Sequence, residues 1–217
     1  MINRKSTVER ETKETEVKIS LNLDGKGRSK INTSYPFLDH MLSLFCYHGF
    51  FDLEIRAKGD TEVDYHHLVE DIGICLGDAA KEALGEKKGI KRYGNCFLPM
   101  DEVLVQVVID ISGRPLLVFN PSSSSGLIHR GINATATSRN SSGAIYRTNS
   151  SNLDLFKEFF RGFSSHSGIT LHINLYYGGN FHHLMEAVFK AFGISLDEAT
   201  QLDQRQRGVP STKGKIE

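Results

Sequence analysis

Two short motifs in this chain contain residues that can bind a metal ion. Residues 66–70 (HHLVE) and 182–186 (HHLME) both read His-His-x-x-Glu. On a helix, residues four apart project from one face, whereas adjacent residues diverge by roughly 100°. The first His and the Glu of each motif can therefore share one ion. The second His and the Glu lie three apart, which also allows convergence, but one ion is not expected to take both histidines, which could serve two different ions. Mixed imidazole and carboxylate ligands suit Mn, Fe, Co or Zn.

The two motifs occupy matching places in an internal repeat. Residues 37–70 and 155–186 each read as a helix, a strand, a glycine-containing turn and a His-His helix. With a two-residue gap in the second turn, the repeat aligns His40 with Glu158 and His48 with His166. His40 and Glu158 therefore join the candidate ligands. The alternative, that these histidines only begin helices, is disfavoured by the matched copies.

The hydrophobic pattern predicts the elements that must position these motifs. Alternation predicts strands at 17–23, 53–57, 103–111, 116–119 and 169–176, and helical spacing predicts helices at 37–47, 66–84, 153–165 and 181–202. Residues 121–151 are rich in Ser, Asn, Gly and Thr, which indicates a long loop or a disordered insertion. We expect an α+β fold of two duplicated halves, 1–94 and 95–217. Each half places helices on one sheet face, and a pseudo-twofold axis relates the two.

Composition limits the class of protein. The chain has 217 residues, 39% of them hydrophobic, and 26 basic side chains balance 26 acidic ones. This balance gives no sign of nucleic-acid or membrane-surface binding, and no apolar run approaches the ~18 residues of a membrane span. The N-terminal residues resemble no targeting signal. Cys46, Cys75 and Cys96 lack motif spacing, so we expect buried thiols in a reducing compartment, the cytosol by default.

Other polar residues are weaker candidates. Basic and hydroxyl side chains that could hold a phosphate are Arg92, Arg114, Lys190 and the segment Ser211–Thr212–Lys213–Gly214. Each alone is more often a solvated surface group. Asp39, Asp64 and Asp71 could orient imidazoles or be ordinary helix-terminal and surface acids. Glu14 by itself reads as a strand residue that faces water.

Several longer motifs together resemble the imidazoleglycerol-phosphate dehydratase family. They are RETKETEVKISLNLDGKG, FLDHML, the HHxxED block, GIKRYG, PMDE, DISGRP, TLHI, HHLMEAVFKAF and PSTKG. The likeness covers nearly the whole chain apart from the Ser/Asn-rich segment. It implies a duplicated α+β fold like domain 2 of ribosomal protein S5. It also implies two divalent ions per site, most often Mn²⁺, and a cytoplasmic homo-oligomer of trimers that build a large octahedral particle.

The same resemblance implies an activity. The enzyme would remove water from D-erythro-imidazole-glycerol phosphate, a step of histidine biosynthesis, and would yield imidazole-acetol phosphate. No carbonyl acidifies the reacting C–H bond, so the substrate's imidazole must hold the electrons, and two cations would favour its imidazolate form. Neither nucleic acid nor membrane is an expected partner.

Residue roles also follow from the resemblance. The implied metal ligands are His40, His66, His67, Glu70, Glu158, His182, His183 and Glu186. The implied substrate contacts are Glu14, His40, His48, His66, Arg92, Arg114, Lys190, Ser211, Thr212 and Lys213. Glu14 would be the catalytic acid/base that moves the carbon-bound proton. The basic and tail residues would fix the phosphate and so the reacting carbons.

Three departures from the family pattern keep alternatives open. Glu158 stands where the family has a ligating His, residues 121–151 exceed the usual loop by about twenty positions, and Tyr65 and Leu68 replace smaller or more polar residues. A catalytically impaired metal-binding paralogue is therefore one alternative, and a dinuclear metal hydrolase is another. The retained Glu14 and phosphate-binding set favour the dehydratase.

Overall fold

The computed structural model describes residues 4–121, 137–139, 145–147 and 150–216. Its first half contains β1 (Lys5–Glu11), β2 (Thr15–Asn22), β3 (Ser29–Asn32), α1 (Pro36–Gly49), β4 (Asp52–Gly59) and α2 (His66–Leu84). Its second half contains β5 (Tyr93–Met100), β6 (Val103–Asp110), β7 (Leu116–Pro121), α4 (Ser150–Ser167), β10 (Thr170–Tyr177) and α5 (Phe181–Thr200). The short strands β8 (Thr137–Arg139) and β9 (Ile145–Arg147) pair with each other.

The two halves have the same topology. The first sheet has the strand order β1-β2-β4-β3 and the second β5-β6-β10-β7. In each sheet the first two pairs are antiparallel and the last pair is parallel. This correspondence confirms the predicted duplicated α+β fold. The second sheet begins at Tyr93, slightly ahead of the division expected after residue 94.

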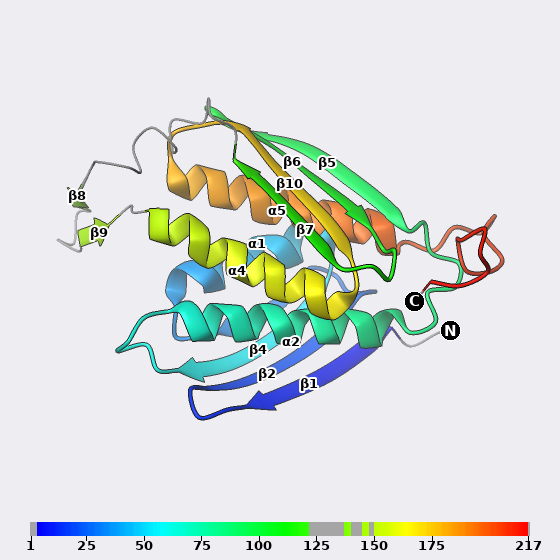
Figure 1. Ribbon diagram of the computed structural model, residues 1–217, viewed down its shortest axis with the longest axis horizontal. Coiled ribbons are helices and arrows are strands. Elements are labelled where there is room, and N and C mark those ends of the chain that lie inside the picture. The colour runs from blue at the N-terminus through cyan, green and yellow to red at the C-terminus, as the bar shows by residue number, and fades with distance from the viewer. Residues whose placement is uncertain (1–3, 122–136, 140–144, 148–149, 217) are drawn as a thin grey trace.

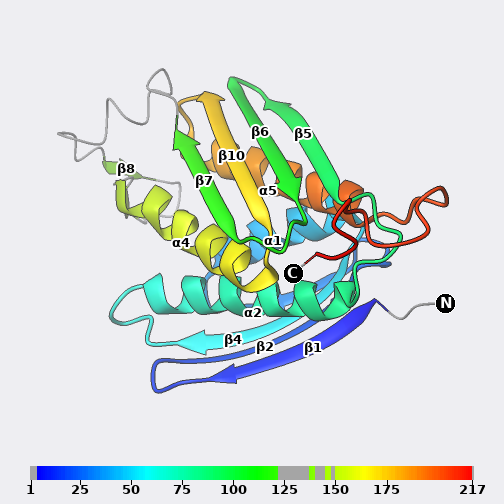
Figure 2. The same cartoon turned by 45° about the vertical axis from the view of Figure 1, so that its right-hand side comes forward.

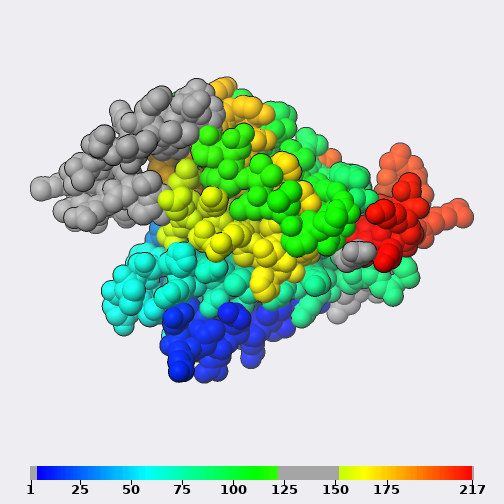
Figure 3. All heavy atoms as spheres, viewed as in Figure 1, coloured from blue at the N-terminus to red at the C-terminus, as the bar shows by residue number. Residues whose placement is uncertain are grey.

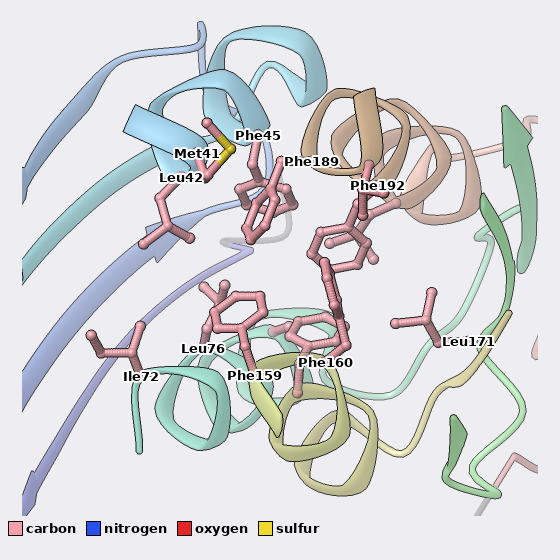
Figure 4. Close-up of a cluster of buried hydrophobic side chains, with 14 of the residues drawn as sticks. Met41, Leu42, Phe45, Ile72, Leu76, Phe159, Phe160, Leu171, Phe189 and Phe192 are labelled. Atoms are coloured by element: carbon pink, nitrogen blue, oxygen red, sulfur yellow. The ribbon is translucent and has the colours of Figure 1, made fainter. Parts of the chain in front are cut away.

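The four long helices lie between the two sheets (Figure 1). Helix α2 packs on β1 and β2, and α5 packs on β5 and β6, so each sheet buries one face. The halves then join through their helices, because α2 contacts α4 and α1 contacts α5. A view turned by 45° shows the same order of layers (Figure 2). The central core is rich in phenylalanine, with Phe45, Phe159, Phe160, Phe189 and Phe192 all fully buried (Figure 4).

Strand prediction succeeded inside the sheets and at the edge strand β7, and it missed the other three edge strands. Strand β2 buries alternate residues and so does β6, as their hydrophobic alternation predicts. Strands β1, β3 and β5 were not predicted; β1 and β3 are the two edges of the first sheet, and β5 is one edge of the second. An edge strand has one neighbour, and the side chains of β1 and β3 are mostly exposed, so neither carries a strong hydrophobic signal.

The helix boundaries lie close to the predicted ones. Helix α2 spans the predicted residues, whereas α4 begins at Ser150, slightly before the predicted start. Strands β8 and β9 lie within the predicted insertion, and the rest of that segment lies outside the described residues.

Two glycines allow the helices of opposite halves to approach closely. A Cβ added at Gly193 on α5 would lie 2.4 Å from the carbonyl oxygen of Phe45 on α1. A Cβ at Gly77 on α2 would lie 2.6 Å from the carbonyl oxygen of Phe163 on α4. The repeat aligns Gly77 with Gly193 and Phe45 with Phe163, so the two crossings are equivalent. These crossings set the distance between ligands carried by different helices.

Candidate metal centre

One group of metal-binding side chains converges across the two halves. His40 projects from α1, and His182 and Glu186 project from the first turns of α5. The Nε2 atoms of His40 and His182 lie 3.0 and 2.9 Å from the same Glu186 oxygen. Potential ligand atoms of all three residues lie within 4.8 Å of one another. We call these residues the first cluster. Two imidazoles and one carboxylate are a donor set that fits a borderline divalent ion.

The carboxylate of the first cluster is held in its charged form. Burial alone raises the pKa of Glu186, but hydrogen bonds from Lys190, His40 and His182 outweigh it and lower the pKa to about 2. Lys190 Nζ lies 2.7 Å from the Glu186 oxygen that the histidines do not contact. A charged carboxylate beside neutral imidazoles is the state that a metal ion requires.

The pseudo-symmetric residues form a second cluster of different chemistry. His66 and Glu70 on α2 face Glu158 on α4, as the repeat alignment predicts, and His66 Nε2 lies 3.6 Å from Glu70. Arg161 forms ion pairs with both carboxylates, at 3.2 Å from Glu70. These three ligands do not form a convergent group among the residues that the structure describes. The second cluster therefore fits a metal ion only after its side chains rearrange.

The second histidine of each motif points elsewhere, as the helical geometry predicts. His67 Nδ1 lies 3.1 Å from Asp60, and His183 Nδ1 lies 3.0 Å from Glu102. Hydrogen bonds to these acids raise the pKa of both histidines. A carboxylate at Nδ1 fixes the ring and leaves Nε2 as the atom that can bind a metal. Asp101, Glu102 and His183 also form a convergent group of potential ligands.

Glu14 lies at the turn between β1 and β2, close to the His67 ring. One of its carboxylate oxygens is 3.7 Å from His67 Nδ1. Its backbone is fixed because its N–H donates to Thr12 Oγ1 and its carbonyl accepts from the Asp60 N–H. Glu14 is exposed, but it sits in a hairpin turn and not within a strand as its sequence context suggested.

A pocket of different character lies at the other end of the second sheet. Its lining is Arg92, Ser112, Arg114, Ser211, Lys213, Lys215 and Ile216. Arg92 is held there by Asp110, at 2.7 Å, and by the carbonyl oxygen of Pro210. The C-terminal tail lies against this end of the sheet (Figure 3). Two guanidinium groups, ammonium groups and hydroxyls make it an anion pocket suited to a phosphate.

Comparison with known proteins decides the family. A sequence model described as imidazoleglycerol-phosphate dehydratase matches residues 33–196. The dehydratase of Citrifermentans bemidjiense is 52% identical over 98% of this chain and 99% of its own length. This chain belongs to the imidazoleglycerol-phosphate dehydratase family. The dehydratase of Syntrophus aciditrophicus is 49% identical over 99% of both chains. The family assignment confirms the predicted function, a hydro-lyase of histidine biosynthesis.

Solved structures of dehydratases share the fold. The Staphylococcus aureus enzyme is 37% identical, with a TM-score of 0.70 over 92% of this chain and 99% of its own. The Pyrococcus furiosus enzyme is 35% identical, with a TM-score of 0.72 over 95% of this chain and 99% of its own. No helix within the described residues is both long and apolar enough to cross a membrane.

The dehydratase residues expected from the sequence fall into separate places. Arg92, Arg114, Ser211 and Lys213 share the anion pocket, whereas Thr212 does not line it and Lys190 lies beside Glu186. His48 lies in the last turn of α1, where burial first and the Lys190 charge second lower its pKa.

The acids expected to orient imidazoles have other contacts. Asp39 accepts from the Thr33 N–H, Asp64 caps the His66 N–H, and Asp71 binds Arg10 and Thr15. The imidazole partners are Asp60 and Glu102, which lie after β4 and between β5 and β6. Sequence reasoning missed both, although Glu102 belongs to the PMDE motif. Arg161 was also missed. Cys46 and Cys75 are buried free thiols as predicted, and Cys96 is half-buried.

Proposed function

We propose that this chain is a metal-dependent dehydratase that converts D-erythro-imidazole-glycerol phosphate into imidazole-acetol phosphate. The observation that carries the proposal is the convergence of His40, His182 and Glu186 within 4.8 Å. Manganese is the ion that the family resemblance favours, and the imidazole and carboxylate donors are compatible with it. Bound at the two clusters, the ions would withdraw electron density from the substrate's imidazole ring. We also propose a cytoplasmic location.

Substrate binding needs the anion pocket as well as the clusters. The substrate carries a phosphate, and Arg92, Arg114, Ser211 and Lys213 offer charged and hydroxyl donors to it. Anchoring the phosphate would restrict the carbon chain and so place the reacting C–H and hydroxyl groups. Thr212 and Lys190 do not line this pocket, so any substrate contact of theirs must be made elsewhere.

The separation of these features supports an oligomer. Strand β5 runs from Tyr93, next to Arg92 of the anion pocket, to Met100, whose sulfur lies 3.6 Å from Lys190 beside the first cluster. An eight-residue strand spans about 27 Å, which is far longer than one small phosphorylated imidazole molecule. A complete site therefore needs the anion pocket of one copy beside the clusters of another. We propose trimers that build a larger octahedral particle, in which the partly exposed His67 and His183 complete the metal sites of neighbours.

Glu14 is the proposed acid/base. It lies on the hairpin turn between β1 and β2, and its side chain is 55% exposed beside the partly exposed His67. Its backbone hydrogen bonds hold the turn, and one carboxylate oxygen lies 3.7 Å from His67 Nδ1. In the assembled enzyme Glu14 would take the carbon-bound proton as a base and then, as an acid, deliver it to the leaving hydroxyl, which departs as water.

The test uses the purified protein, stripped of metal with a chelator and reloaded with Mn²⁺. We expect no turnover without metal and formation of imidazole-acetol phosphate after reloading. Glu186→Gln should lose bound Mn²⁺ and activity together. Arg114→Ala should keep Mn²⁺ and raise the KM, because it removes only a phosphate contact. Mn²⁺ binding with no product would instead indicate the impaired paralogue, and release of inorganic phosphate would indicate a hydrolase.

A further inference from the structure

The two clusters differ most in the cation beside their carboxylates. In the first cluster the cation is Lys190, one turn after Glu186 on α5. In the second it is Arg161, three residues after Glu158 on α4. The repeat aligns Lys190 with Ile74 and Arg161 with Ser43, so neither cation has a counterpart in the other half. The asymmetry therefore belongs to this chain's individual residues and not to the duplicated fold.

Arg161 lies between the two acids of the second cluster. Its guanidinium forms an ion pair with the Glu158 oxygen Oε2, a buried atom that has no hydrogen-bond partner among the described residues. The same group reaches Glu70 at 3.2 Å. Two nearby carboxylates repel each other unless a cation lies between them. Arg161 thus stands at the position where a divalent ion would bridge these acids.

The position of Ser43 shows what the first half has instead. Its hydroxyl donates to the carbonyl oxygen of Asp39 at 2.8 Å and leaves the first cluster open. There His40, and not an acid, faces the motif on the opposite helix, so no second carboxylate requires neutralisation. Glu158 and Arg161 are consequently coupled features: an acid replaces the imidazole, and an arginine neutralises it.

We propose that Arg161 is an internal substitute for the second metal ion and makes the two metal sites unequal. The first cluster binds a divalent cation directly, whereas the second binds one only when Arg161 withdraws. The Arg161 side chain is 56% exposed, so it can swing into solvent while Glu70 and Glu158 stay in place. This inference rests on the proposed metal-dependent function.

The experiment titrates the metal-free, assembled protein with MnCl2, following bound and free Mn²⁺ by calorimetry and electron paramagnetic resonance. Wild type should show two classes of site with different affinities. Arg161→Ser, which introduces the residue at the matching position 43, should tighten the weak class by about tenfold, since a charge-assisted pair no longer competes. The strong class should not change. Lys157→Ser removes an exposed positive charge from the same helix and is the matched control, expected to leave both classes unchanged.

Thermal unfolding gives a second readout that does not depend on activity. Without metal, Arg161→Ser should melt below wild type, because its two acids lack a cation, and saturating Mn²⁺ should restore more stability to it than to wild type. Arg161→Lys keeps the charge, so its melting temperature and Mn²⁺ affinities should match those of wild type. This variant keeps the inference testable if Arg161→Ser does not fold. A single class of sites in wild type, or an unchanged weak class in Arg161→Ser, overturns the inference while leaving the proposed function intact. Absence of Mn²⁺ binding in every variant overturns both.

Discussion

A methyl group added at Gly193 tests whether the helix crossing positions the first cluster. The Cβ of Gly193→Ala would lie 2.4 Å from the Phe45 carbonyl oxygen, whereas ordinary contact begins at 3.4 Å. The obstacle is backbone, so relief requires α1 and α5 to separate by about 1 Å. Because His40 lies on α1 and His182 and Glu186 on α5, the same movement widens the first cluster.

The two contributions to stability have opposite signs. Overpacking a well-packed interior costs roughly 1–3 kcal/mol, while replacing a helical Gly by Ala contributes about 1 kcal/mol in the stabilising direction. We expect a net loss of about 1 kcal/mol, which lowers the Tm of a domain of this size by about 2–4 °C. Helix propensity alone predicts the opposite result, a rise in Tm of similar size.

Thermal unfolding of metal-free protein and Mn²⁺ titration together measure these effects. Gly193→Ala should melt earlier than wild type and bind the first Mn²⁺ more weakly. Gly179→Ala is the control, because a Cβ there meets no atom within 4 Å. A Gly193→Ala protein that is more stable than wild type, with unchanged Mn²⁺ affinity, would refute the role assigned to this crossing.

Three further perturbations probe other parts of the molecule. Glu14→Gln should retain fold and Mn²⁺ but lower kcat by about 10²–10⁴-fold, and undiminished turnover would show that the proton moves through another group. Glu158→His should preserve or raise Mn²⁺ affinity in a direct titration, because it gives position 158 the same side chain as His40, with which the repeat aligns it. Loss of the ion would count against the alignment. Asp24→Asn should cost about 1 kcal/mol in urea unfolding, because it weakens the acceptor of buried Arg4. A hydrogen bond from Arg4 lowers the pKa of Asp24, so the pair stabilises the fold above pH ~4. The difference in unfolding free energy between variant and wild type should therefore vanish as pH falls through the lowered pKa. A difference that persists in acid would contradict this account.

The sequence by itself determined the elements whose signals are local. Helical periodicity places the His-His pairs at the start of α2 and α5. The structure adds that Asn180, the N-cap of α5, accepts from the His182 N–H group, and that Asp64 accepts from the His66 N–H group. The divergence of adjacent side chains on a helix then separates His66 from His67 in any fold that keeps the helix. Internal repetition revealed the duplication and the correspondence of His40 with Glu158.

Tertiary structure decided everything that depends on distant segments meeting. Pairing of α1 with α5 and of α2 with α4 follows from long-range packing of buried phenylalanines across glycine crossings, which no local pattern encodes. Only that pairing joins His40 to His182 and inserts Arg161 between Glu70 and Glu158. It also separates the anion pocket from the clusters by the length of a strand. Side-chain type fixes what a residue can bind, but a shared site requires positions that chain topology alone brings together.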